Sequence, residues 1–252
     1  MLRKTVRVGF LFFVVAMLAP VLVRSATVDW GGASWYTASR APSGLAPQPE
    51  AEPRAVVQVY AARTFGWRGV LAVHTWMITK TEGAPSYRRF DVVGWGGGRK
   101  VRENFGAPDG FWYGARPELL LDLRDEAAAR LIPSLHQAVA DYPWANAYRS
   151  FPGPNSNTFM AHVARSVPEL GLDLPPTAIG KDYRQLSDPI GRPPSGRGMQ
   201  LSLMGLAGLI VSPEEGFEVN FLGLSAGLDL KDPAFRLPGW GRIGPGPRSD
   251  KP

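Results

Sequence analysis

Residues 70–79 read Val-Leu-Ala-Val-His-Thr-Trp-Met-Ile-Thr, a run dominated by apolar and β-branched side chains. Such a run is typical of a β-strand. Because successive side chains of a strand point to opposite faces, alternate residues share a face. His74 therefore lies on the face that also carries Ala72, Trp76 and Ile78. A polar residue on an otherwise apolar strand needs a partner or a function, so His74 is a candidate for either.

The rest of the chain predicts an α+β domain with a mainly antiparallel sheet and two main helices. β-Branched and aromatic runs bounded by turn residues predict the strands. Apolar residues at helical spacing predict the helices. Strands are expected at 56–60, 70–79, 87–95 and 118–123, and helices at 126–140 and 158–167.

Two glycine-punctuated apolar segments, 200–212 and 216–229, predict a C-terminal β-hairpin. The part between residues 201 and 211 carries no charge. We expect it to contribute to the core of a sheet. The alternative is a surface that faces a bilayer or a partner.

The first residues of the chain have the pattern of a membrane-targeting segment. Arg3, Lys4 and Arg7 precede the apolar stretch 8–23, as in a secretory signal or signal anchor. Sixteen residues are somewhat short for a membrane span, but we favour a retained anchor over a cleaved signal. The positive end then stays in the cytoplasm. This predicts a single-pass protein of the bacterial inner membrane, with its domain in the periplasm or extracytoplasmic space.

These features divide the chain into four parts. Residues 1–26 are the membrane anchor or signal segment, and residues 27–53, which are rich in proline and small residues, are a linker. Residues 54–185 form the core of the domain, and residues 186–252 form a loop and hairpin extension.

Composition excludes several functions. The chain has no cysteine and only three histidines, so we expect no thiolate or histidine-rich metal site and no cofactor. The net charge is +6, and the first 24 residues hold four basic and no acidic residues. The remainder lacks the concentrated basic face that nucleic-acid binding requires. The membrane is the expected partner, through the N-terminal segment, and the oligomeric state stays open.

Candidate chemistry centres on residues 155–159, Asn-Ser-Asn-Thr-Phe, which open a helix after Pro-Gly-Pro. A nucleophile at a helix start is flanked by free N–H groups that can hold an oxyanion. Ser156 is the candidate nucleophile, His74 the base and Asp91, on the next strand, the group that orients it. The N–H groups of Asn157 and Thr158 are the expected oxyanion donors.

This order, with a histidine on a strand and then a nucleophile at a helix start, resembles the circularly permuted papain-like hydrolases. The lecithin retinol acyltransferase-like enzymes and the permuted NlpC-type peptidases belong to that group. Their helix opens with Asn-Cys-x-x-Phe, and residues 155–159 match it except that Ser156 stands in place of cysteine. The resemblance covers roughly residues 56–167 and implies a permuted papain-like core. Serine is harder to ionise than cysteine, which disfavours catalysis.

A second resemblance covers nearly all of the predicted extracytoplasmic part. The chain resembles a bacterial membrane-protein family whose domain has no assigned function. The phrases that carry this are VVQVYAARTFGWRG (56–69), AVHTW (72–76), GPNSNTF (153–159), LDLPPTAIGKDY (172–183), LMGLAG (203–208) and EEGFEVNFLGL (214–224). The resemblance implies an anchored envelope protein and no particular activity.

Two functions remain. The first is a non-catalytic envelope protein that binds a peptide, glycan or lipid, with Ser156 as a helix cap. Its expected ligand contacts are Asn155, Asn157, Thr158 and Trp76. The alternative is a serine-dependent hydrolase or acyltransferase acting on an envelope amide or ester. Most of the eight tryptophans are interpreted as core, although some, with Tyr113, are candidates to line a groove.

Overall fold

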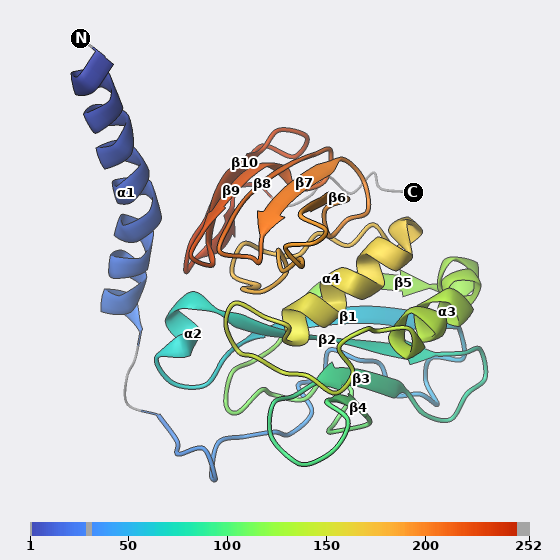
Figure 1. Ribbon diagram of the computed structural model, residues 1–252. Coiled ribbons are helices and arrows are strands. Elements are labelled where there is room, and N and C mark those ends of the chain that lie inside the picture. The colour runs from blue at the N-terminus through green and yellow to red at the C-terminus, as the bar shows by residue number, and fades with distance from the viewer. Residues whose placement is uncertain (1, 29–31, 246–252) are drawn as a thin grey trace.

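The computed structural model describes residues 2–28 and 32–245. Helix α1 stands beside an α+β body that contains two antiparallel sheets (Figure 1), which confirms the predicted fold class at this level. The elements, in chain order, are α1 Leu2–Thr27, β1 Val56–Arg63, α2 Arg68–Leu71, β2 Val73–Lys80, β3 Arg88–Val92, β4 Val101–Glu103, β5 Glu118–Arg124, α3 Asp125–Ala140, α4 Ser156–Ser166, a short 3-10 helix Pro168–Leu170, β6 Ile190–Gly191, β7 Met199–Leu203, β8 Ala207–Ser212, β9 Gly216–Phe221, β10 Leu224–Asp229, β11 Ala234–Leu237 and β12 Gly241–Ile243.

The first sheet has the strand order β4-β3-β2-β1-β5. Its central strands β1 and β2 are almost entirely buried on both faces, so the polar side chains that they carry, such as His74, lie in the interior. Helices α3 and α4 cover one face, where Met77 of β2 packs in one cluster with Leu135 and Phe159. The opposite face carries a second, aromatic cluster that includes Trp76 and Trp112.

Residues between 32 and 53, predicted as a linker, pack against this aromatic face. The Trp35 ring stacks on Tyr113 with centroids 3.6 Å apart. The Asp109 carboxylate accepts hydrogen bonds from the Ser43 hydroxyl and from the N–H groups of Leu45 and Ala46. The segment is therefore held against the body by the Asp109 carboxylate and by ring stacking.

The second sheet is a meander of seven strands in the order β12-β11-β10-β9-β8-β7-β6. The prediction of one hairpin was wrong here, because each predicted strand folds back on itself. Within segment 200–212 the chain reverses at Met204-Gly205, and within 216–229 at Leu222-Gly223. All four residues have positive φ, as tight hairpin turns of this kind require.

This sheet carries its apolar side chains outward. On β7, Met199, Leu201 and Leu203 are exposed, whereas Gln200 and Ser202 are buried. The expectation that residues 201–211 form ordinary sheet core is therefore wrong. Alternation identified the strand, but it does not identify which face is covered.

Charged residues lie under the sheet instead. The Lys181 ammonium pairs with Glu218, whose other oxygen accepts from Arg236 Nε at 2.8 Å. Arg236 also binds both carboxylate oxygens of Asp173, at 2.7 and 2.9 Å. Burial alone would raise the pKa of Glu218, but Lys181 and Arg236 hold it below its ordinary value. This buried network fixes the sheet to residues 173–182 of the body.

Helix α1 is long and apolar enough to cross a membrane by length and composition. It runs beside the second sheet (Figure 1) and packs against α2 and β10. Phe13 meets Phe221 edge to face with centroids 5.8 Å apart, and the Trp240 indole N–H donates to the Pro20 carbonyl at 2.7 Å.

Candidate functional site

A cavity of about 830 Å³ opens where α2, the start of β2 and the start of α4 meet the β9–β10 turn. Its lining is mostly apolar and aromatic, with a few polar groups. The residues around it are Trp35, Thr64, Phe65, Trp67, Arg68, Leu71, Ala72, Val73, His74, Val92, Gly94, Trp95, Trp112, Tyr148, Ser150, Phe151, Asn155, Ser156, Asn157, Ile179, Leu222 and Leu224.

His74 and Asp91 are brought together at the buried side of this cavity. His74 Nε2 lies 2.7 Å from Asp91 Oδ1, and both side chains are almost fully buried. Arg89 Nε donates to the other oxygen of Asp91 at 2.5 Å. β3 pairs with β2 so that Arg89 faces Ile78, which places Asp91 diagonally across from His74 on the same face of the sheet.

The charges of Asp91 and Arg89, together with burial, determine the protonation state of His74. Burial lowers the pKa of His74 below its ordinary value, against the hydrogen bond to Asp91. Burial would raise the pKa of Asp91, but Arg89 and His74 hold it below its usual range. At neutral pH a neutral His74 therefore donates from Nε2 to a charged Asp91. Nδ1 then carries a lone pair and accepts no hydrogen bond from any described residue.

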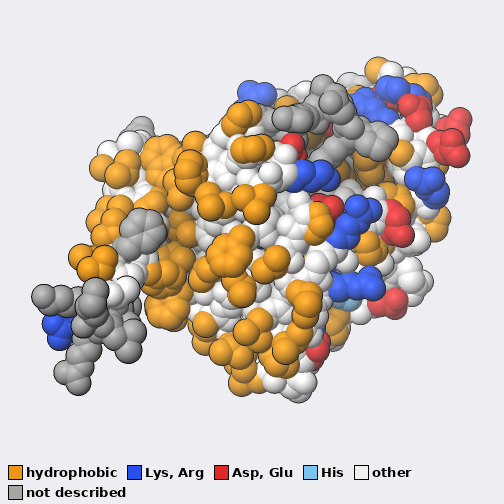
Figure 2. Space-filling view, turned by 90° about the horizontal axis from the view of Figure 1, so that it is seen from above, with side chains coloured by type: hydrophobic (Ala, Val, Ile, Leu, Met, Phe, Trp, Pro, Cys, Tyr) orange, Lys and Arg blue, Asp and Glu red, His pale blue; other side chains and the backbone are white. Residues whose placement is uncertain are grey.

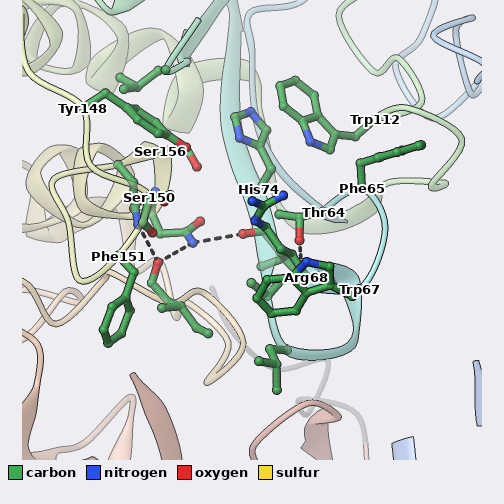
Figure 3. Close-up of a pocket in the computed structure, with 18 of the residues that line it drawn as sticks. Thr64, Phe65, Trp67, Arg68, His74, Trp112, Tyr148, Ser150, Phe151 and Ser156 are labelled. Carbon is green, nitrogen blue, oxygen red and sulfur yellow. Dashed lines mark hydrogen bonds between the residues drawn. The ribbon is translucent and has the colours of Figure 1, made fainter. Parts of the chain in front are cut away.

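The His74 ring is held flat against Trp112, with centroids 3.5 Å apart and planes 5° from parallel. In Figure 3, Tyr148 and Ser156 lie on one side of His74 and Trp112 on the other. Trp76, an expected ligand contact, is fully buried, donates to the Pro108 carbonyl at 2.8 Å and does not line the cavity. Trp112 occupies the position that Trp76 was expected to take.

Asn155, rather than Ser156, caps helix α4. Its side-chain oxygen accepts from the N–H groups of Asn157 and Thr158 at 2.9 and 3.1 Å, in a complete capping box. Its amide nitrogen donates to the carbonyls of Ser150 and Ile179. The two N–H groups expected to hold an oxyanion thus already have an acceptor.

Asn157 and Thr158 have further structural partners. The Asn157 amide donates to the carbonyls of Val73 and Ile179. The Thr158 hydroxyl donates to the Gly180 carbonyl at 2.8 Å. These contacts tie the start of α4 to β2 and to the loop that follows α4.

Ser156 is the first residue of α4 and borders the cavity. Within residues 2–28 and 32–245, neither its hydroxyl nor its own N–H group has a hydrogen-bond partner, so no hydrogen bond joins it to His74. The reason is geometric. Val73 and Met77 of β2 face α4, whereas His74, which alternates with Val73, faces the aromatic cluster with Trp76 and Trp112.

The aromatic lining was largely missed by sequence reasoning, which interpreted most tryptophans as core. Trp67 and Trp95 are 61% and 40% exposed and border the cavity together with Trp35 and Trp112. In the sequence, the high tryptophan content indicated such a lining. No local pattern grouped these four residues, because they come from distant segments. Arg68, also missed, stands exposed at the cavity and forms no ion pair with a described residue.

The described residues hold no cluster of three or more histidine, aspartate or glutamate side chains suited to a metal ion. The polar groups at the cavity are a histidine, an arginine, a tyrosine, hydroxyls and amides. Such a set favours an organic ligand.

Comparison with known families places residues 54–183, more than half of the chain, in a family described as a protein of unknown function, DUF3750. The chain belongs to the DUF3750 family. The matched DUF3750 region contains His74, Asp91 and Ser156, whereas Trp35 and the β9–β10 turn lie outside it. Neither the curated proteins nor the solved structures contain a match.

Proposed function

We propose that the protein is anchored in the bacterial inner membrane by α1 and binds the apolar chain of a lipid-like ligand in its cavity. The observation that carries this is the cavity itself. Its volume of about 830 Å³ and its mostly apolar, aromatic lining suit a ligand whose surface is largely hydrocarbon.

Two polar groups complement an anionic or hydroxyl-bearing head group. Nδ1 of His74 is an acceptor for a hydroxyl or a protonated acid. Arg68 lies exposed at the cavity beside Trp67, with its guanidinium 5.3 Å from the ring centroid. Arg68 has no carboxylate partner among the described residues, which favours a ligand carboxylate or phosphate at that end.

The anchor brings the cavity to a source of such ligands. The basic residues before the apolar stretch favour a cytoplasmic N-terminus and an extracytoplasmic body. Helix α1 packs against α2 and β10, and α2 and the turn before β10 both border the cavity. A membrane lipid beside α1 is therefore close to the cavity without first crossing water.

The test is native mass spectrometry of the full chain purified in a mild detergent. We expect one lipid-like molecule to stay bound per chain. Ala72 borders the cavity, so Ala72→Phe should fill part of it and reduce the bound fraction several-fold.

Ala129→Phe makes the same chemical change on an exposed position of α3 and should leave the bound fraction unchanged. A wild-type chain that carries no ligand, or equal loss in the two variants, would contradict the proposal.

A second function, serine-dependent hydrolysis or acyl transfer on a permuted papain-like core, has two supporting observations. Ser156 and His74 border the same cavity, and the N–H of Ser156 has no acceptor among the described residues. The reaction also needs His74 to take the Ser156 proton through a hydrogen bond, and no hydrogen bond joins these two side chains.

A fluorophosphonate probe separates the two functions. Catalysis predicts labelling of the full chain that disappears in both Ser156→Ala and His74→Ala while each variant stays folded. Binding alone predicts no labelling and an unchanged ligand fraction in Ser156→Ala, whose hydroxyl has no partner among the described residues.

A further inference from the structure

The outward face of the seven-stranded sheet is apolar at every strand position. The strand register aligns these side chains in rows that cross the sheet. One row joins Met199, Val211, Phe217, Leu228, Phe235 and Ile243. The next row joins Leu201, Leu209, Val219 and Ala226. No charged side chain interrupts either row.

The inward face of the same strands has the opposite character. Positions that alternate with the apolar rows carry Gln200, Glu218 and Arg236, all buried. In a water-soluble antiparallel sheet the apolar face packs inward and the polar face is solvated. Here the polarity is inverted, so the outward face needs an apolar medium to cover it.

Helix α1 continues this face. Phe221, at the end of β9 on the outward side, contacts Phe13, and Leu11, Val15 and Leu22 of α1 are about half or more exposed. Figure 2 shows the molecule from above, which is the side on which the seven-stranded sheet lies in Figure 1. Hydrophobic side chains cover α1 and continue across the neighbouring surface, while most Lys, Arg, Asp and Glu side chains lie away from α1.

The contacts between α1 and the rest of the protein also indicate how much of the membrane thickness the body would occupy. They run from Phe13 to Arg24, whose guanidinium lies 5.7 Å from the Trp240 ring centroid. Eleven residues of helix rise about 16 Å, which is about half of the ~30 Å hydrocarbon core. A tryptophan beside an arginine at the end of an apolar helix is typical of the membrane–water interface.

We propose that the outward face of the seven-stranded sheet inserts into one leaflet of the bilayer that α1 crosses, and that lipid acyl chains cover it. The inference rests on the proposed anchoring by α1 and is independent of a ligand in the cavity. The protein is then held by two adjoining apolar surfaces, a spanning helix and a sheet that lies in the outer half of the same membrane.

The absence of cysteine makes the test clean, because one introduced cysteine gives one labelled position in the full chain. Val211→Cys and Phe235→Cys sit on the sheet face, where the native side chains are 53% and 60% exposed. Val15→Cys reports on α1, and Ala129→Cys, on α3, is the aqueous control. Each variant carries an environment-sensitive fluorophore and is reconstituted in phosphatidylglycerol–phosphatidylethanolamine vesicles.

The labels at 211, 235 and 15 should be quenched several-fold by a nitroxide on the lipid acyl chain and shielded from aqueous iodide. The label at 129 should behave in the opposite way. Iodide quenching at 211 and 235, with the label at 15 still lipid-quenched, overturns the sheet insertion alone. Shielding of 211 and 235 from both quenchers overturns it in favour of a protein partner or second copy. Iodide quenching at 15 contradicts the anchoring, and the sheet insertion with it.

Discussion

At the residue scale, the site rests on Asn155 and His74, whose polar atoms are used differently. Asn155 uses both ends of its amide, and His74 uses Nε2 for Asp91 while Nδ1 stays available. The sequence predicted that His74 and Asp91 lie on adjacent strands. Their diagonal contact depends on the register between β2 and β3, which alternation alone does not fix. The sequence predicted a cap at Ser156, whereas Asn155 caps the helix; both residue types are favoured caps, so propensity alone did not separate them.

The capping geometry predicts unequal effects for two neighbouring residues. Asn155→Ala removes the cap and the links to Ser150 and Ile179, and should lower the free energy of unfolding by about 2 kcal/mol or more. Ser156→Ala should cost less than about 0.5 kcal/mol, because its hydroxyl has no partner among the described residues. Urea unfolding of both variants in the same detergent measures this, and equal losses would contradict the assignment of the cap.

The buried state of His74 predicts a pH dependence. In the unfolded chain His74 takes up a proton near its ordinary pKa of 6.5, whereas burial holds the folded pKa below that value. The unfolded state therefore binds more protons below pH 6.5, and stability falls as the pH falls through this range. His74→Asn should make the fall between about pH 7 and pH 5 shallower, with the remainder due to His136 and His162, whose pKa values are also lowered by burial.

Unfolding midpoints measured across that range give the comparison for His74→Asn. Curves for wild type and variant that fall in parallel would show that His74 does not contribute.

At the element scale, composition and periodicity located β1, β2, β3, β5 and both main helices. They missed β4, β6, β11 and β12, and the strand predicted over 70–79 included residues 70–71, which belong to α2. The start of α4 was expected at Thr158 and lies at Ser156. The second sheet was harder to predict. Alternation such as Met-Gln-Leu-Ser-Leu in β7 identifies a strand with one apolar face, but it is the same whether that face meets a core or a bilayer. The buried ion pairs of Glu218 and Arg236 decide the orientation, and those partners are distant in sequence.

The ion-pair network predicts where the second sheet is most sensitive. Glu218→Ala leaves Lys181 and Arg236 buried with one partner fewer each, and should cost about 3 kcal/mol or more. Glu103→Ala removes an exposed pair with Arg88 and should cost less than about 1 kcal/mol. Thermal unfolding of both variants tests this, and a loss for Glu218→Ala no larger than that for Glu103→Ala would argue against the network as the attachment of the sheet.

At the scale of the whole molecule, the cavity assembles from segments that no local pattern connects. Trp35 comes from the N-terminal segment, Trp67 from the position before α2, Phe151 from the approach to α4 and Leu222 from the β9–β10 turn of the second sheet. Sequence reasoning therefore identified His74 and Ser156 as neighbours of a site but not the aromatic walls, which depend on long-range packing. The same packing brings α1, the cavity and the apolar sheet face to one side of the molecule.

Occupation of the cavity by a membrane lipid is tested by photo-crosslinking of the full chain in vesicles that contain a phospholipid with a diazirine near the end of its acyl chain. The adducts are located by peptide mass spectrometry. Because the cavity is proposed to hold an apolar chain, adducts should occur on cavity peptides around Trp112 and Tyr148, which belong neither to α1 nor to the second sheet, and decrease in Ala72→Phe. Adducts confined to α1 and the sheet face, with the cavity peptides unmodified, would contradict the account.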